Sequence, residues 1–367
     1  MSPEPVVVAV IGCGRVAGHH CRSIAMTPHV RLAAVCDLVA EMADAYAKEF
    51  GVPGYLNYHE MLRRHPEVTT VAVITPSGMH FEHATDIIQQ YRRHVIVEKP
   101  TFMTPSQVRE CYALARTHGV HVFPVFQNRY NKAVSRVRRG LTDGELGPVR
   151  IAAVRVRWNR PQRYYDLAPW RGTFAMDGGA LTNQGIHHID LLRHLVGPVS
   201  RVNASMRTLG AQIEVEDSVV ATLIFRGGVV GTLEVTTAAR PQDYEASISL
   251  VCEHGLAQIG GIAVNELQVF TPAPAECAAW SEDFSGNVYG HGHGAMYGDL
   301  AAFLLWGTPY PVDEDDCSST IELLHSFYVS SETGSWAEVG SGGESLRLGQ
   351  PDELLASLYR TPRTHSS

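Results

Sequence analysis

Two short stretches of the sequence place chemically capable side chains directly beside apolar segments. The first is VIVEKPT (residues 95–101), where an apolar run ends in Glu98 and Lys99 and Pro100 follows. A lysine held at the end of a buried strand and partly desolvated would have a lowered pKa, so it could polarise or shuttle a proton. Read alone, the stretch is equally typical of a strand that stops and leaves an ion pair at the surface.

The second stretch is ALTNQGIHHIDLLRHLVG (residues 180–197). At helical spacing, one face carries four polar side chains: Asn183, His187, Asp190 and His194. A histidine here, His187, could act as a general base near neutral pH. His188 points away from His187 and is interpreted as structural. The alternative is a polar helix face in water.

A glycine-rich turn, GCGRVAG, follows the first apolar run. Its glycines permit a tight turn and a close approach of the backbone to a pyrophosphate, with a helix N-terminus facing the phosphates. A carboxylate at the end of the next strand would accept hydrogen bonds from both ribose hydroxyls and repel a 2′-phosphate, which favours NAD over NADP, although Arg15 could contact a phosphate. The predicted NAD-binding residues of this segment are Gly12, Gly14, Arg15, Val16, Ala17 and Asp37.

The first third of the chain alternates strands with helices. Strand-like runs lie at residues 6–11, 31–37, 67–75, 94–100 and 121–127. Continuous apolar strands joined by helices predict a parallel sheet covered on both faces, and the carboxyl ends of such strands line the cofactor crevice. The stretch TPSGMH (75–80) ends the third run and would lie in this crevice. The alternative interpretation is an ordinary strand-to-helix turn. The crevice adds further candidates for cofactor contact: Thr75, Pro76, His80, Glu98, Lys99 and Gln127.

Near residue 148 the pattern changes to alternating apolar and polar residues separated by Gly-rich turns, which predicts a mostly antiparallel sheet. Helical segments are expected near 178–196, 294–306 and 318–333. The sequence therefore predicts an α/β Rossmann domain with a parallel, doubly wound sheet, followed by an α+β domain with a large open sheet. The expected boundaries are 1–124 for the first domain, 125–340 for the second and 341–367 for a weakly structured tail.

Composition narrows the classes of protein. The chain has 367 residues, 45% hydrophobic and 19% charged, with a net charge of -8, which argues against nucleic acid and anionic membrane as partners. Seven scattered cysteines, no basic leader and no long apolar run predict a cytoplasmic protein with reduced thiols. The two histidines of HGHG (291–294) lack carboxylate or cysteine partners in the sequence, so no metal is expected.

Taken together, the GxGxxA turn, the EKP at the fourth strand and the GG…NxxxHxxD helix resemble the glucose–fructose oxidoreductase/inositol dehydrogenase/MocA superfamily. The resemblance spans nearly the whole chain. It implies NAD-dependent hydride transfer at a sugar or polyol carbon, with Lys99 and His187 as the reacting residues. Many relatives carry Asp where this chain has Asn183, and since an amide cannot act as a base, that role shifts toward His187.

A narrower resemblance covers residues 155–192, 214–237 and 287–300. It is to the branch that oxidises UDP-N-acetylglucosaminuronic acid at C-3, whose product feeds a transamination. This branch assembles through its open sheets, which implies a homo-oligomer, either a dimer or a tetramer. By the same matching, Trp170 and Arg171 would lie against the cofactor. The residues implied to contact the sugar are Lys99, Arg160, Tyr164, Tyr165, Asn183, His187, Tyr289 and His291.

Three alternatives remain open at the level of sequence. The same chemistry could act on a glycoside or on an aminoglycoside sugar in antibiotic biosynthesis, or it could run as reduction of a 3-keto sugar. A non-catalytic, NAD-binding regulator is the third, and the presence of both Lys99 and His187 argues against it. For residues 158–165 taken without the family, an aromatic sheet edge is the simpler interpretation.

Overall fold

The computed structural model of the chain describes residues 3–284 and 289–362. Contacts divide the chain into two compact units. Unit 1 comprises Met1–Val125, His293–Cys317 and Pro351–Ser367, and unit 2 comprises Phe126–Gly292 and Ser318–Gln350. The contiguous boundaries expected from the sequence therefore do not describe the division, because two later segments return to unit 1.

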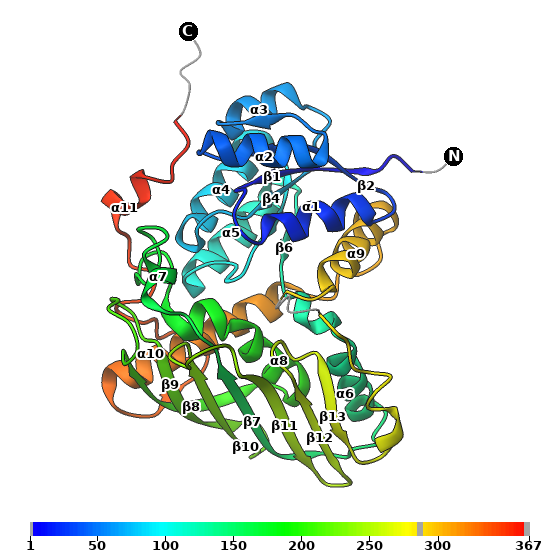
Figure 1. Cartoon of the computed structure of the whole chain (residues 1–367), viewed down its shortest axis with the longest axis vertical. Coiled ribbons are helices and arrows are strands. Elements are labelled where there is room, and N and C mark those ends of the chain that lie inside the picture. The colour runs from blue at the N-terminus through cyan, green and yellow to red at the C-terminus, as the bar shows by residue number, and fades with distance from the viewer. Residues whose placement is uncertain (1–2, 285–288, 363–367) are drawn as a thin grey trace. The chain divides into compact units, whose positions relative to one another are not determined.

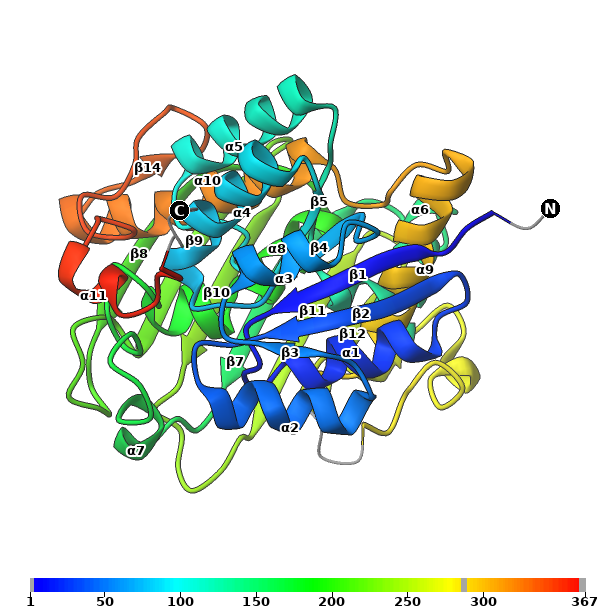
Figure 2. The same ribbon diagram turned by 90° about the horizontal axis from the view of Figure 1, so that it is seen from above.

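Unit 1 is built on a six-stranded sheet in the order β3-β2-β1-β4-β5-β6, with every strand pair parallel. All six residues of β1 are buried, as expected for a strand covered on both faces. Helices α1 and α2 lie on one side of the sheet and α4 and α5 on the other (Figure 2). The strands are β1 (Val6–Ile11), β2 (Val30–Cys36), β3 (Gly54–Tyr55), β4 (Thr70–Val73), β5 (His94–Val97) and β6 (Val122–Pro124).

Some helices of unit 1 begin at a residue whose side chain caps them. In α5, Thr104 and Gln107 form a capping box and Pro105 occupies the first turn, while Asn57 caps α3 with its side chain. The helices are α1 (Ala17–Met26), α2 (Ala40–Phe50), α3 (Tyr58–Arg64), α4 (His80–Tyr91), α5 (Pro105–His118), α9 (Gly292–Trp306) and α11 (Glu353–Ser357).

Specific contacts explain why the later segments return to unit 1. The Phe303 ring of α9 lies 5.5 Å from the Phe123 ring of β6. Arg360 forms ion pairs with Glu82 of α4 and with Glu353 of α11. The expectation of a weakly structured tail from residue 341 is thus corrected, because α11 and these ion pairs order the stretch from residue 351 to residue 362.

Unit 2 contains an eight-stranded sheet in the order β13-β12-β11-β7-β10-β9-β8-β14. Only the β10–β7 pair is parallel, so the sheet is mostly antiparallel, as predicted. The strands are β7 (Val149–Arg157), β8 (Val199–Arg207), β9 (Ser218–Phe225), β10 (Val230–Thr236), β11 (Glu245–Cys252), β12 (Leu256–Gly260), β13 (Glu266–Phe270) and β14 (Ala337–Glu338).

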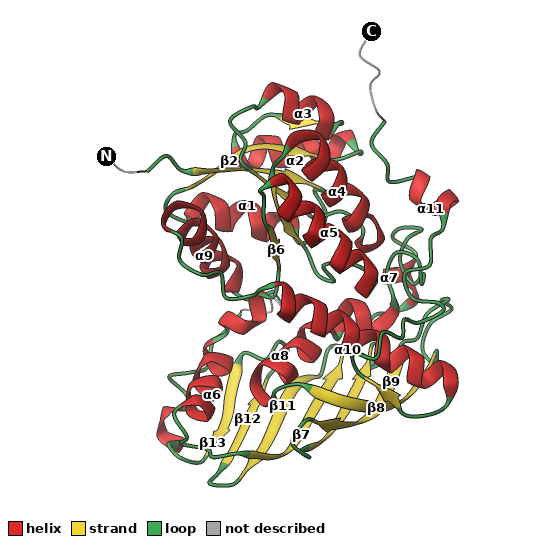
Figure 3. Cartoon of the chain, turned by 180° about the vertical axis from the view of Figure 1, so that it is seen from behind, coloured by secondary structure: helices red, strands yellow, loops and turns green. Residues whose placement is uncertain are grey.

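Burial alternates along the strands of unit 2, most regularly in β9 and β10. The helices α6 and α8 lie over the buried face (Figure 3), and the other face is open to solvent. The helical elements are η2 (Gln127–Tyr130), α6 (Lys132–Thr142), α7 (Gln162–Tyr165), the π-helical turn η3 (Ala180–Gln184), α8 (Ile186–Val196) and α10 (Glu314–Thr333), whose first four residues belong to unit 1.

The two architectures confirm the predicted fold class, and Figure 1 shows the element order along the chain. The sequence did not predict the short elements β3, α3 and α6. None of the described helices combines the length and the apolar character needed to cross a membrane.

Candidate active site

The glycine-rich turn of unit 1 has the geometry that a dinucleotide requires. Gly12 has φ +90°, and a Cβ there would meet the Ile74 carbonyl oxygen at 2.4 Å, so only glycine fits. Gly14 is exposed, and a Cβ there would meet nothing within 4 Å. Helix α1 starts at Ala17, directly after the turn. The open backbone followed by a helix N-terminus is a cradle for a pyrophosphate.

Asp37 lies immediately after β2 and is half-buried. Its Oδ2 accepts the Cys13 N–H at 2.7 Å, and its Oδ1 accepts the Val39 N–H at 2.8 Å. These two bonds tie the carboxylate to the glycine-rich turn. Each oxygen keeps a second lone pair for a ribose hydroxyl, so the residues present fit NAD.

The end of β4 carries Thr75, Pro76 and, one turn later, His80. Thr75 and Pro76 are half-buried, whereas His80 is only 1% exposed. The His80 ring bridges two carbonyl oxygens, Thr75 O and Pro100 O, each at 2.9 Å. Burial lowers the pKa of His80. The neutral ring has one N–H and donates to one of the two carbonyls at a time, so it ties that carbonyl to α4, a structural task that the sequence did not reveal.

The lysine turn follows β5, as the sequence predicts. Lys99 is half-buried, and its backbone N–H donates to Glu98 Oε2 at 2.9 Å. The other oxygen of Glu98 is 2.9 Å from His20 Nε2. Burial alone would raise the pKa of the Glu98 carboxyl, but His20 and, at 3.7 Å, His293 hold it well below its usual range. Glu98 is therefore a buried, ionised carboxylate attached to the backbone of Lys99.

His187 lies in the first turn of α8 and is buried. Its Nε2 is 3.3 Å from the amide nitrogen of Gln127 in η2. An amide N–H can only donate, so in this arrangement His187 Nε2 accepts and the ring proton is on Nδ1. A ring nitrogen with a lone pair is what a general base needs.

Arg129 fixes the position of Gln127 relative to α8. Its guanidinium makes a two-pronged ion pair with Asp190, with Nε at 2.8 Å and Nη2 at 2.6 Å, and both side chains are buried. Asp190, predicted to share a functional face with His187, thus serves to join η2 to α8. Arg129 was not identified from the sequence.

Asn183 lies in the π-helical turn η3 rather than in a regular α-helix. The predicted helical face spanning residues 183–194 is therefore interrupted, because a π turn changes the register between Asn183 and His187. The Asn183 amide donates to Asp177, which is 1% exposed and also accepts the Gly172 N–H at 2.7 Å. A carboxylate therefore lies beside Asn183, and no sequence signal indicated Asp177.

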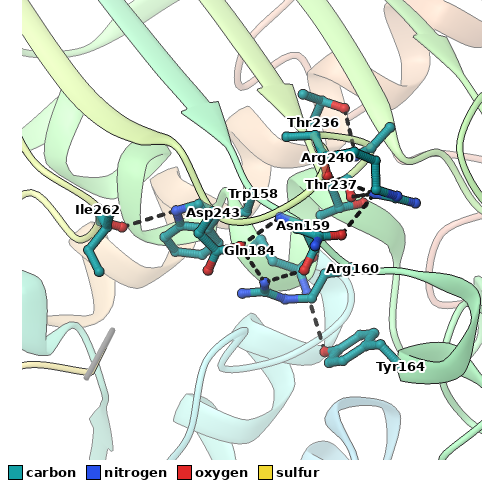
Figure 4. Close-up of polar contacts among 12 residues, drawn as sticks. Trp158, Asn159, Arg160, Tyr164, Gln184, Thr236, Thr237, Arg240, Asp243 and Ile262 are labelled. Carbon is teal, nitrogen blue, oxygen red and sulfur yellow. Dashed lines mark hydrogen bonds and ion pairs between the residues drawn. The ribbon is translucent and has the colours of Figure 1, made fainter. Parts of the chain in front are cut away.

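Two arginines flank one tyrosine near the end of β7. The Arg171 guanidinium lies 4.4 Å from the Tyr164 ring and 4.6 Å from the Trp170 ring. Arg160 lies 5.6 Å from the same tyrosine and bonds to Asp243 at 2.9 Å (Figure 4). Gln184 of η3 donates to the Tyr164 hydroxyl at 3.4 Å. These contacts bring Arg160, Tyr164, Trp170 and Arg171 together next to the π-helical turn.

The remaining predicted residues also belong to unit 2. Tyr165 is buried, with its hydroxyl 3.0 Å from Thr237 Oγ1. His188 is fully buried, and burial lowers its pKa to about 4, in agreement with its structural interpretation. Tyr289 is half-buried, and the exposed His291 lies 5.4 Å from the Phe284 ring. Residues 287 and 288, part of the third matching stretch, lie outside the described residues.

The fold and this site define an NAD-dependent oxidoreductase. Residues 6–126 match the profile described as oxidoreductase family, NAD-binding Rossmann fold, and residues 134–258 match the GFO/IDH/MocA C-terminal domain. The chain belongs to the GFO/IDH/MocA family, as its sequence predicted, and its cofactor is NAD.

Several relatives are similar along most of their length. The WlbA dehydrogenase of Bordetella pertussis, solved with NADH and UDP-GlcNAcA, is 32% identical with a TM-score of 0.85, covering 92% of this chain and 99% of that one. The D-glucoside 3-dehydrogenase of Escherichia coli (strain K12) is 30% identical over 65% of this chain and 72% of its own. GenD2 from gentamicin A biosynthesis, solved with NAD, is 25% identical with a TM-score of 0.79, covering 92% and 97%.

Proposed function

We propose that the protein oxidises the C-3 hydroxyl of a nucleotide-linked pyranose, such as UDP-N-acetylglucosaminuronic acid, to a 3-keto sugar that a later transamination consumes. The likeness to the WlbA dehydrogenase, solved with NADH and UDP-GlcNAcA, is the observation that carries the proposal. Arg160 and Arg171, which both lie close to the Tyr164 ring, support an anionic substrate.

In this proposal each residue of the site has its own role in the reaction. NAD, when bound, supplies the hydride acceptor. His187 takes the hydroxyl proton on Nε2 once the substrate hydroxyl replaces the Gln127 amide, which otherwise donates to the single lone pair of that nitrogen. Lys99 stabilises the developing alkoxide by its charge. Asn183, held by Asp177, donates to or accepts from a neighbouring sugar hydroxyl. The remaining contacts to the sugar come from Arg160, Tyr164, Tyr165, Tyr289 and His291.

Two variants test these roles. We expect Lys99→Ala and His187→Ala each to lower turnover by roughly 10²- to 10⁴-fold, the range of a lost acid–base group. NAD should still bind, because the glycine-rich turn is untouched. Absorbance at 340 nm measures turnover, and titration calorimetry measures NAD affinity. Turnover near the wild-type value in both variants would refute the assignment.

A different sugar is the second candidate. The likenesses to a D-glucoside 3-dehydrogenase and to GenD2 favour the same oxidation on a glycoside or on an aminoglycoside sugar. UDP-N-acetylglucosaminuronic acid, UDP-N-acetylglucosamine, methyl glucoside and an aminoglycoside should be compared in one assay. A preference for the sugar acid over the UDP sugar that lacks the carboxylate supports the first candidate, and a preference for either glycoside supports the second. Reduction of bound NAD by the sugar, compared with oxidation of bound NADH by the 3-keto sugar, distinguishes the direction.

We infer that copies of the chain associate through the open face of the sheet in unit 2. This face exposes apolar side chains that water would otherwise cover: Ile151, Val220, Val230, Val251 and Leu256. Light scattering of the purified protein measures the assembly as monomer, dimer or tetramer, and a monomer would contradict the inference.

A further inference from the structure

Three side chains from distant parts of the sequence enclose Glu98 in unit 1. His20 of α1 and Tyr297 of α9 are each 0% exposed, and Glu98 is 5% exposed. His20 Nε2 lies 2.9 Å from Glu98 Oε1, and His20 Nδ1 lies 2.8 Å from the Tyr297 hydroxyl. The third, His293, places its ring 4.7 Å from the ring of His20. The result is a buried chain of polar atoms from Tyr297 through His20 to Glu98.

The chemistry of the atoms fixes the direction of these hydrogen bonds. An ionised carboxylate only accepts, so His20 Nε2 carries the proton that Glu98 receives. His20 Nδ1 is then the acceptor, and the Tyr297 hydroxyl donates to it. Burial raises the pKa of Tyr297 well above its ordinary value, so the phenol keeps this proton. Tyr297 thereby holds His20 in the tautomer that can donate to Glu98.

The chain ends at the backbone of Lys99. Glu98 uses Oε1 for His20 and Oε2 for the Lys99 N–H, so its two oxygens are committed to different partners. On the far side of the turn, the His80 ring contacts the Pro100 carbonyl at 2.9 Å. The Lys99 N–H is thus fixed by a buried carboxylate, and the buried His80 ring lies against the next residue, although the lysine side chain itself has four rotatable bonds.

We propose that His20 and Tyr297 are positioning residues for Lys99, acting through Glu98. The proposal rests on the proposed function of Lys99. A catalytic group must be held within about 0.5 Å of its productive place, and a displacement of about 1 Å can lower turnover by roughly 100-fold. An anchored Lys99 peptide meets this need, because it removes backbone freedom from a flexible side chain.

Two substitutions of the same histidine separate positioning from simple packing. In His20→Gln, the amide nitrogen falls near the place of Nε2 and can still donate to Glu98. In His20→Asn, the shorter amide falls near the place of Nδ1, so it can meet Tyr297 but cannot reach Glu98. We expect His20→Asn to lower kcat by roughly 10- to 100-fold, with NAD affinity retained, and His20→Gln to restore most of the loss. Tyr297→Phe should show a smaller loss of kcat.

A similar arrangement in the same unit supplies a matched control. His59 Nδ1 lies 2.8 Å from the Tyr91 hydroxyl and 3.7 Å from Asp86, and both His59 and Asp86 are buried. This group lies between α3 and α4 and has no part in the lysine turn. His59→Asn should therefore lower the melting temperature while leaving kcat at the wild-type value.

The decisive comparison combines His20→Asn with Lys99→Ala. If His20 acts through Lys99, the double variant is no slower than Lys99→Ala alone. Additive losses in the double variant would overturn the inference. So would a His20→Asn variant with the wild-type kcat, and so would a His20→Gln variant whose kcat is no higher than that of His20→Asn. A stoichiometric metal in the purified protein would also overturn it, because His20, Glu98 and His293 place three ligand atoms within 4.8 Å. If Lys99→Ala itself keeps turnover, the proposed function fails instead.

Discussion

Glu98 in unit 1 and Glu216 in unit 2 are buried to the same extent, with 5% of each residue exposed, yet their charge states differ. Glu98 is held ionised, with a pKa well below its usual range despite burial. Burial, with a smaller contribution from the charge of Asp177, raises the pKa of Glu216 to about 8 against the hydrogen bonds from Leu181 and Tyr328. Glu216 is thus mostly protonated at neutral pH.

The hydrogen-bond geometry explains the difference. Glu98 receives a donor on each oxygen, from His20 and from the Lys99 backbone. Both donors to Glu216 point at Oε1, with Leu181 N at 3.0 Å and the Tyr328 hydroxyl at 2.9 Å. Its Oε2 has no hydrogen-bond partner among the described residues. Burial alone therefore does not set the charge of a carboxyl; the number and direction of its donors decide whether ionisation survives.

The largest effect in this comparison should come from Glu216→Gln. The folded carboxyl keeps its proton up to about pH 8, whereas the unfolded one loses it near 4.5. Wild-type stability is therefore complete below pH 4.5 and is lost as pH rises toward 8, at about 1.4 kcal/mol per pH unit. A glutamine amide replaces the protonated Oε2 and has no such dependence. Between pH 5 and 8 the variant should gain up to about 4 kcal/mol on wild type, measured by urea unfolding at both values. If the unfolding free energies of wild type and variant changed with pH in parallel, Glu216 would be ionised in the folded protein.

For Glu98→Gln, the difference in stability from wild type should change with pH in the opposite sense. A glutamine has only one acceptor oxygen. Its NH2 group must therefore point at a second donor, which is either His20 Nε2–H or the Lys99 N–H. We expect a loss of about 2 kcal/mol in the free energy of unfolding at pH 7. The contribution of wild-type Glu98 is present above the ordinary pKa of 4.5 and is lost as pH falls through its lowered folded pKa. The gap between wild type and variant should therefore narrow in acid, and a gap that widens there would contradict the assignment.

The same contrast shows what the sequence could and could not predict. Continuous apolar runs predicted the parallel sheet, β1 with its bounds, and the place of the lysine turn after β5, because these follow from local pattern. His20 and Tyr297 are 277 residues apart, and nothing local indicates that α9 returns to unit 1. Asp177 was equally hidden, since its contact with Asn183 depends on a π turn where regular helical spacing was assumed. The roles of Lys99 and His187 stay predictions that kinetics must test.

The smallest effect concerns the glycine that packs against the neutral carboxyl. Gly179 has φ +73°, and a Cβ there would come within 2.3 Å of Glu216 Oε2. Gly119, at the end of α5, has φ +66° but would meet nothing within 4 Å, so Gly119→Ala measures the backbone strain alone, about 1 kcal/mol. Gly179, at φ +73° and ψ -170°, lies in a region that is almost exclusive to glycine, so Gly179→Ala adds a larger backbone strain as well as the displacement of Glu216, and its loss should exceed that of Gly119→Ala by at least about 1 kcal/mol. Urea unfolding of both variants measures the difference. Because neither the backbone strain nor the contact with Oε2 depends on the charge of Glu216, the extra loss should persist below pH 4.5, where the pH-dependent contribution of Glu216 has vanished. Equal losses in the two variants would contradict the prediction.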